Sequence, residues 1–232
     1  MLDTNLLNIK NFKKWILPIL IFLAHEYYSK IIIKLSVVYG SKSFAMIYFI
    51  ANSVEVLLFL CIIHFVYKDN FNSIDSSKKI NVLKSILISI VVYIIVFYLG
   101  KIISIIIYNV FGNVKSINNS VIQAAERVSI FTYFEVVFMG PILEEIIYRQ
   151  LVFGYLYDLH SGCNKYIRFI TASIVSSIVF GSIHNGVFHP YMLFYVTSGI
   201  ILSSLYVYTK RLSSPIIVHI LINLIPYLRK LL

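Results

Sequence analysis

Charged residues are scarce in this chain. They make up 13% of its 232 residues, against about 25% in soluble domains, while 59% of the residues are hydrophobic. The hydrophobic residues fall into runs long enough to cross a lipid bilayer. The composition therefore excludes an ordinary soluble protein and predicts a polytopic membrane protein.

Cysteines and common catalytic signatures are equally sparse. Cys61 lies in an apolar run and Cys163 in a connecting stretch, which excludes a disulfide framework and a zinc site built from thiolates. The chain lacks internal repeats, low-complexity tails, a His-Glu-x-x-His motif and a Gly-x-Ser-x-Gly motif. Without a soluble domain, any chemistry must take place in or beside the bilayer.

Seven hydrophobic segments are long enough, or nearly so, to span a bilayer as helices of about 20 residues. They cover residues 15–38, 44–67, 85–109, 130–157, 168–185, 190–209 and 212–228. We expect an all-α transmembrane helix bundle of about seven spans, with eight as the alternative. The polar stretch 113–128 is expected to form an amphipathic surface helix.

The net charge of +10 would suggest nucleic acid in a soluble protein, but here the basic residues lie between the hydrophobic segments. One set of alternate loops carries eleven of them and the other set carries five. The positive-inside rule then places the N-terminus in the cytoplasm, followed by an uncleaved first span. Frequent Ile, Asn, Lys and Tyr favour a bacterial cytoplasmic membrane, and no nucleic-acid partner is expected.

The fourth segment contains two adjacent glutamates and an arginine, Glu144, Glu145 and Arg149. Charges in hydrocarbon cost roughly 3 kcal/mol or more, so they are rare and usually functional. On a helix Glu145 and Arg149 share a face, whereas Glu144 points about 100° away. Glu144 is thus a candidate general base or metal ligand. The alternative is a structural ion pair beside one protonated acid.

Other polar residues in the hydrophobic segments are predicted to be structural, either pairing between helices or reaching toward an interface. They are His25, Glu26, Glu55, His64 and Lys101. Glu135 lies above Glu144 on the predicted helix, and we expect it to support the site or to form an interhelical hydrogen bond.

Two histidines on the last segments suggest a second half of a site. His184 ends the fifth segment, and His219 shares a helix face with Asn223 four residues later. A lone histidine on an apolar helix is usually a core residue. Two imidazoles and a carboxylate, however, are what is needed to bind zinc with one open position or to deprotonate a water. The amide of Asn223 is a candidate donor to an oxyanion.

Three motifs in this order resemble the CAAX protease and bacteriocin-processing (CPBP, or Abi) family of intramembrane proteases. They are Glu-Glu-x-x-x-Arg at 144–149, Phe-x-x-x-His at 180–184 and His-x-x-x-Asn at 219–223. Pro141 also fits the family pattern. Tyr148 and Gln150 depart from it, and the bulk of Gln150 is expected to disturb close helix packing. The resemblance implies a catalytic core over 130–232. Residues 1–129 then form an N-terminal region of about three spans plus the amphipathic segment, and the two regions make one integral membrane domain.

The resemblance implies an intramembrane endopeptidase, either a metalloprotease or a glutamate-type protease. Glu144 and His184 would activate water, while His219 and Asn223 would stabilise the oxyanion. Glu145, Arg149 and Phe180 would support them, with the two glutamate roles open to exchange. If zinc is bound, its ligands would be Glu144, His184 and His219. The expected partners are membrane lipids and a membrane-embedded substrate, such as a prenylated or leader-type peptide.

Three other functions remain as alternatives. The first is a non-catalytic membrane protein for bacteriocin self-immunity, and the second is a transporter or proton channel with a polar relay. The third is a serine protease, because several serines lie near the histidines. Counting about 1.5 Å per residue puts His184 nearer the outer face than Glu144 and His219. The fifth segment is therefore expected to be tilted or to end at the site, at Asn185 and Gly186.

Overall fold

The computed structural model describes residues 16–39, 41–68, 71–116 and 130–231, and these parts contain helices but no strands. The elements are α2 (Leu17–Tyr39), α3 (Ser41–Cys61), η3 (Ile62–Val66), α4 (Val82–Phe111), α6 (Ile130–Phe134), η4 (Glu135–Met139), α7 (Gly140–Glu145), η5 (Ile146–Phe153), α8 (Gly154–Leu159), α9 (Lys165–Asn185), α10 (Met192–Thr209) and α11 (Ser213–Leu231), where η marks a π-helical segment. Each of the seven predicted segments is helical, which confirms the all-α prediction.

Within the residues that the structure describes, four helices are long and apolar enough to cross a membrane. They are Met46–Val66, Val82–Phe111, Lys165–Asn185 and Met192–Thr209, and the apolar part of α11 is shorter. The chain is therefore a polytopic membrane protein, as predicted. The predicted surface helix at 113–128 lies mostly outside the described residues, as does the basic N-terminal segment before residue 16.

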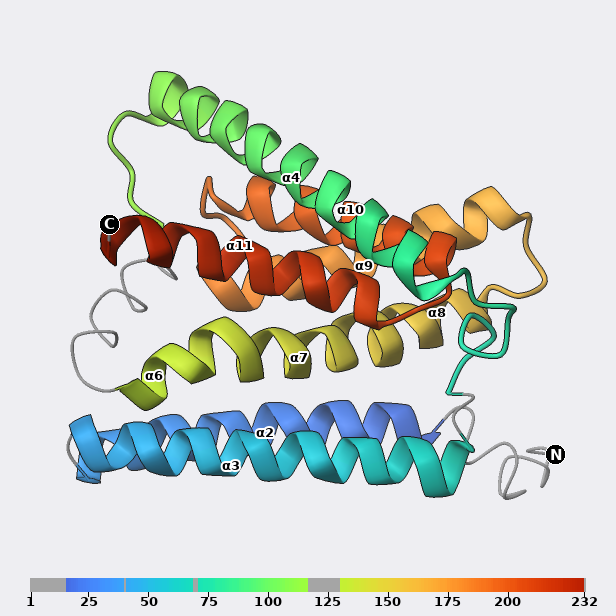
Figure 1. Cartoon of the computed structure of the whole chain (residues 1–232), viewed down its shortest axis with the longest axis horizontal. Helices are drawn as coiled ribbons and strands as arrows, with labels where there is room; N and C mark the ends of the chain where they lie inside the picture. Colours follow the sequence, from blue (N-terminus) through green and yellow to red (C-terminus); the bar gives the residue numbers. More distant parts are fainter. Residues whose placement is uncertain (1–15, 40, 69–70, 117–129, 232) are drawn as a thin grey trace, which may run out of the picture.

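The segments from α6 to α8 follow one another without a gap and form one helical rod through the middle of the molecule (Figure 1). Within this rod, α-helical and π-helical segments alternate. The pair α2 and α3 packs along one side of the rod. Helices α9, α10 and α11 pack on the other side, and α4 crosses over α10 and α11. The three sequence motifs therefore lie on the rod, α9 and α11, which are neighbours.

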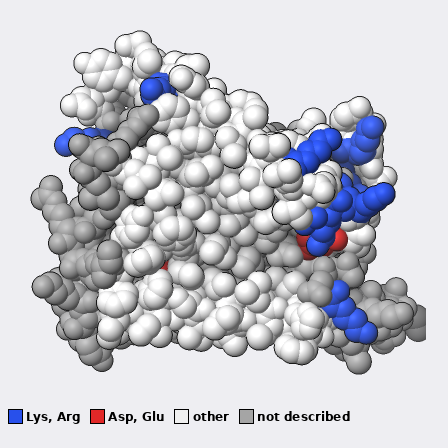
Figure 2. All heavy atoms as spheres, in the orientation of Figure 1, with Lys and Arg blue, Asp and Glu red and all other residues white. Residues whose placement is uncertain are grey.

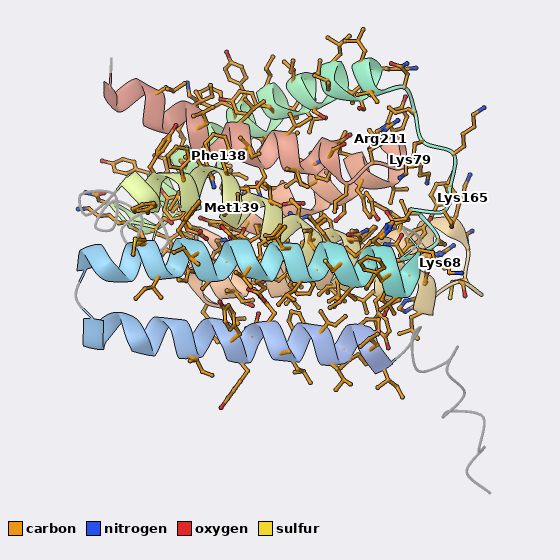
Figure 3. The ribbon with its side chains drawn as sticks, turned by 60° about the horizontal axis from the view of Figure 1, so that its bottom comes forward. Lys68, Lys79, Phe138, Met139, Lys165 and Arg211 are labelled. Atoms are coloured by element: carbon orange, nitrogen blue, oxygen red, sulfur yellow. The ribbon has the colours of Figure 1, made fainter. Side chains whose placement is uncertain are left out.

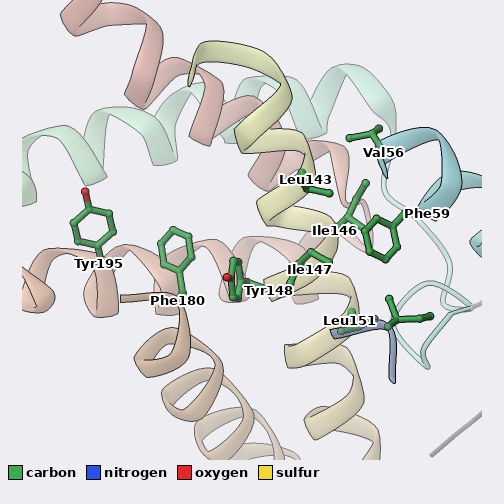
Figure 4. Packing of buried hydrophobic residues seen from close by; sticks show 10 residues of the cluster. Val56, Phe59, Leu143, Ile146, Ile147, Tyr148, Leu151, Phe180 and Tyr195 are labelled. Atoms are coloured by element: carbon green, nitrogen blue, oxygen red, sulfur yellow. The ribbon is translucent and has the colours of Figure 1, made fainter. Parts of the chain in front are cut away.

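Apolar side chains fill the interface between the rod and its neighbours. Val56 and Phe59 of α3 face Ile146 and Ile147 of η5, and Ile147 is fully buried (Figure 4). This packing holds the α2–α3 pair against the segment that carries the charged residues.

Most of the basic side chains in view gather at one end of the bundle, a few lie at the opposite end, and the middle of the molecule is almost entirely uncharged (Figure 2). Lys68, Lys79, Lys165 and Arg211 come from three different connections but lie at this same end (Figure 3). The structure thus places these four members of the larger basic set together, as the alternation of loops requires. That this end faces the cytoplasm stays a prediction.

A polar loop packs between the helices at the basic end. Asn72 donates to the carbonyl of Gln150 at 2.9 Å and to the hydroxyl of Tyr206 at 3.1 Å. Gln150 and Tyr206 in turn donate to Asp75. Burial raises the pKa of the Asp75 carboxyl above its ordinary value, although these two hydrogen bonds lower it.

A Cβ on Gly154 would lie 2.3 Å from the Asn72 amide nitrogen, so the loop can pack this closely only because residue 154 is glycine. The side chain of Gln150, whose bulk was expected to disturb close helix packing, instead donates to Asp75 in this loop.

Candidate active site

Side chains from three helices meet around the carboxylate of Glu144. Glu144 Oε2 lies 3.4 Å from His184 Nε2 and 3.6 Å from His219 Nε2. Glu144 is on α7, His184 on α9 and His219 on α11. The structure therefore brings together the three residues that the sequence singled out for catalysis or zinc binding.

The Nδ1 atom of each imidazole already has a hydrogen-bond partner. His184 Nδ1 lies 2.8 Å from the carbonyl oxygen of Phe180, which can only accept a hydrogen bond. His219 Nδ1 lies 2.8 Å from Glu145 Oε1. Both Nδ1 atoms therefore donate, and in the neutral rings both Nε2 atoms face Glu144 as acceptors. Two unprotonated ring nitrogens and a carboxylate oxygen therefore converge. Because all three are acceptors, the site suits a ligand that donates hydrogen bonds or carries positive charge, such as a water or a metal ion.

The adjacent glutamates differ in environment. Glu145 is fully buried and its Oε2 lies 3.1 Å from Arg149 Nε, while the Glu144 side chain is 29% exposed. Arg149 is also buried, and its guanidinium lies 4.4 Å from the centre of the Phe180 ring. Glu145 is therefore held between an arginine and a histidine, whereas Glu144 stays accessible to a small reactant.

Aromatic rings fix the position of His184. Its ring centre lies 4.5 Å from that of Phe180 and 4.7 Å from that of Tyr195, on which it stacks. Phe180 also meets the edge of Tyr148 at 5.2 Å. Phe180 thus contacts both Arg149 and His184. Sequence reasoning missed Tyr195, because nothing in its local sequence marks a residue that stacks on a distant helix.

The depth problem raised by the sequence has a structural answer. Helix α9 ends at Asn185, and Gly186 follows with φ of +78°, a backbone conformation that glycine adopts without strain. The predicted helix end beside His184 is therefore confirmed. The calculation that separated His184 from Glu144 was wrong, because Glu144 Oε2 lies within 3.4 Å of His184 Nε2.

Asn223 has a partner on the central rod. Its amide donates to the carbonyl of Val136 at 2.8 Å. That carbonyl is left without a helical partner because the Gly140 N–H bonds to Glu135 instead, and Pro141, which stands where the next donor along a π-helical turn would be, has no N–H. One of the two amide hydrogens of Asn223 is therefore engaged by the backbone of η4, and the other has no partner among the described hydrogen bonds.

One further polar pair links the rod to α3, and another links α2 to α3. Glu135 accepts a hydrogen bond from Asn52 at 2.5 Å, which is one of the two roles expected for it. His25 Nδ1 lies 2.8 Å from Glu55 Oε1, so the predicted pairing between helices is confirmed for these residues. Glu135 and Glu144 both lie near Gly140: a Cβ on that glycine would be 4.0 Å from an oxygen of each.

The serines near the histidines do not form a nucleophile pair. Among the hydrogen bonds of the described residues, their hydroxyls bind helix carbonyls or have no partner, and none binds a histidine. They are Ser176, Ser177, Ser182, Ser198, Ser203 and Ser204.

The donor types at the site suit zinc. Metal-bound histidines usually donate their second ring N–H to a carboxylate or a carbonyl, as His184 and His219 do here. Within the residues that the structure describes, however, no group of three His, Cys, Asp or Glu side chains is spaced to hold a metal ion. Glu144, His184 and His219 offer ligand types that zinc accepts.

Comparisons with known proteins point to one family. The family model for type II CAAX prenyl endopeptidases, Rce1-like, matches residues 126–225. The membrane-embedded CAAX protease MroQ of Staphylococcus aureus (strain USA300) is 37% identical over 124 residues, 53% of this chain and 49% of that protein. The putative membrane peptidase YdiL of Bacillus subtilis (strain 168) is 34% identical over 184 residues, 77% of this chain and 68% of that protein.

This chain thus spans about half the length of the first relative and about two thirds of the second. No solved structure matches it. The matched residues include all three motifs and the helices that carry them. The chain belongs to the CAAX protease family of integral membrane proteases.

Proposed function

We propose that this chain is an intramembrane endopeptidase that hydrolyses a peptide bond in a membrane-associated or lipid-modified peptide. The observation that carries the proposal is the convergence of His184 Nε2 and His219 Nε2 on Glu144 Oε2, at 3.4 Å and 3.6 Å. A water beside these atoms has two hydrogens to donate, so it can bind Glu144 and one of the two Nε2 atoms together.

Glu144 is the general base in this proposal. It takes a proton from the bound water, whose oxygen then forms a bond to the carbonyl carbon of the peptide. When the carbon–nitrogen bond breaks, Glu144 returns the proton to the leaving nitrogen. Its 29% exposure supports this assignment over Glu145, which is fully buried and engaged on both oxygens.

The remaining residues position the reactants. His184 holds the water with Glu144, and its Nδ1 bond to Phe180 fixes the ring. Glu145 orients His219 through the 2.8 Å bond, and Arg149 offsets the charge of Glu145. His219, in its protonated form with an N–H on both ring nitrogens, and the second amide hydrogen of Asn223 stabilise the oxyanion of the tetrahedral intermediate, while the first hydrogen ties α11 to Val136.

If zinc takes part, Glu144, His184 and His219 would hold it. A bound zinc ion acidifies a water and polarises a carbonyl. The roles of Glu145, Arg149 and Phe180 in positioning these residues would be unchanged.

Cleavage of a library of membrane peptides by the purified chain in detergent tests the proposal. We expect turnover by the wild type and none by Glu144→Gln or His219→Ala. Glu55→Gln and His25→Ala are matched controls, because they alter an intramembrane Glu–His pair outside the site and should keep activity. Loss of turnover with a chelator and its return with zinc would assign the metal.

A different pattern would overturn the proposal. If the wild type and the Glu144 and His219 variants fail alike to cleave any peptide yet protect cells equally from a bacteriocin, the chain is a non-catalytic immunity protein. Equal cleavage by all of them would remove Glu144 from the mechanism.

A further inference from the structure

Glu135 is a buried carboxyl to which the proposed mechanism gives no role. It lies on η4 of the central rod and is 6% exposed. Asn52 of α3 donates to its Oε1 at 2.5 Å, but its Oε2 is buried and makes no hydrogen bond among the described residues. A link between two helices needs only a neutral polar side chain, whereas a carboxyl inside a membrane bundle costs more and is usually functional.

A change of helix type brings Glu135 to the same side of the rod as Glu144. The Gly140 N–H bonds to the Glu135 carbonyl, five residues earlier, as in a π-helical turn. Glu144 follows Gly140 by four residues on the α-helix α7, which is about one turn. Gly140 therefore lies between the two glutamates along one face of the rod.

Oxygen atoms of both glutamates surround the position beside Gly140. A Cβ on this glycine would lie 3.1 Å from the Glu135 backbone oxygen and 4.0 Å from both Glu135 Oε1 and Glu144 Oε1. All three atoms accept hydrogen bonds, and an oxygen that already has one donor can accept a second. The backbone of Gly140 is α-helical, with φ of −55°, so the position does not require the conformational freedom of glycine. What glycine provides is room beside three acceptors, which suits a water.

We propose that a water beside Gly140 connects Glu135 to Glu144, and that Glu135 is a positioning residue for the general base. The inference rests on the proposed peptidase function. The water donates one hydrogen to Glu144 Oε1 and the other to the carboxyl or the backbone oxygen of Glu135, and Asn52 fixes that carboxyl from α3. Glu144 Oε1 is then held from the rod while its Oε2 faces the two histidines, which keeps the carboxylate aimed at the reacting water.

Kinetics of four variants with a peptide that the wild type cleaves test this role. Glu135→Leu removes the carboxyl that holds the water, and Gly140→Ala fills the position of the water. Each should lower kcat about ten- to hundredfold with KM nearly unchanged, as expected for losing a hydrogen bond to a charged group. Glu135→Gln should keep most of the activity, because its amide oxygen still accepts from Asn52 and from the water. The double variant Glu135→Leu/Gly140→Ala should be no slower than either single variant, because both act through one water.

Glu55→Leu is the matched control. Glu55 also has one hydrogen-bonded oxygen and one buried oxygen without a partner, but it lies on α3 and pairs with His25. Its replacement should leave kcat unchanged. Turnover by Glu135→Leu or Gly140→Ala at the wild-type rate would overturn the inference. Additive losses in the double variant, or a Glu135→Gln protein as slow as Glu135→Leu, would overturn it too.

An experimental structure that resolves ordered waters separates this inference from the peptidase proposal. We expect a water within hydrogen-bond distance of Glu135 and of Glu144 Oε1 in the wild type, and its loss in Gly140→Ala, whether or not the wild type cleaves a peptide. A wild-type protein without this water would contradict the inference. A wild type that holds the water but cleaves nothing would reject the peptidase and retain the link between the two glutamates.

Discussion

Replacing Asn72 with alanine should destabilise the protein although no charge or large apolar side chain is lost. Asn72 is 5% exposed and bridges the loop after α3 to the rod and to α10. Its amide donates to the Gln150 carbonyl and the Tyr206 hydroxyl, while its carbonyl accepts the backbone N–H groups of Ile74 and Asp75. Alanine makes none of these four contacts.

The expected cost follows from those four contacts. Each hydrogen bond contributes about 1 kcal/mol net, and a buried partner left without one costs more. Tyr206 keeps its bond to Asp75 at 2.6 Å, so it is not left unpaired. We therefore expect Asn72→Ala to lower the free energy of unfolding by about 2–4 kcal/mol.

Equilibrium unfolding by SDS titration in mixed micelles, followed by circular dichroism, measures this loss. Asn81→Ala is the matched control: Asn81 is exposed and only caps α4, accepting from Leu83 and Lys84, so its loss should cost about 1 kcal/mol. Equal costs for the two variants would refute the reasoning that the loop is structurally tied to the bundle.

Three other substitutions have distinct expected outcomes. Arg149→Met should lower the free energy of unfolding by about 3–5 kcal/mol in the same titration, because it leaves the buried charge of Glu145 without its arginine. Adding Glu145→Gln should restore part of this loss. A double variant without any recovery would contradict the role of the ion pair. For Asp75 the folded protein holds the proton more tightly than the unfolded chain, so stability should fall as pH rises from the ordinary pKa of 3.8 toward the raised folded pKa. Asp75→Asn should flatten that part of the profile, and an unchanged slope would exclude Asp75 as its source. Gly199→Ala should cost about 1–3 kcal/mol because its Cβ would lie 2.6 Å from a side chain of α9, whereas Gly162→Ala, with nothing within 4 Å, should be neutral; similar effects would refute the close approach of α9 and α10.

The sequence was sufficient to predict the helices and the residues that meet at the site. Hydrophobic runs predict spans because a bilayer demands internally hydrogen-bonded, apolar segments. The spacing of Glu145 and Arg149 predicted the ion pair, because residues four apart share a helix face. The order of the three motifs, through the family resemblance, singled out Glu144, His184 and His219.

Contacts between distant segments could not be predicted in the same way. Asn72 meets Gln150 and Tyr206 across 78 and 134 residues, and no local pattern marks such partners. The carbonyl that binds Asn223 is free only because a π-helical turn coincides with Pro141. The relative placement of the helices also escaped prediction, which is why the sequence separated His184 from Glu144.

The central claim is that Glu144 activates water while Glu145 positions His219. Comparing Glu144→Gln and Glu145→Gln for kcat and for the free energy of unfolding tests it most directly. The account predicts that Glu144→Gln lowers kcat by at least about 10²- to 10⁴-fold with unchanged stability. Glu145→Gln should lower stability as well, because it leaves Arg149 buried without its partner. Full turnover by Glu144→Gln, with inactivity of a stably folded Glu145→Gln, would contradict the account and exchange the two roles.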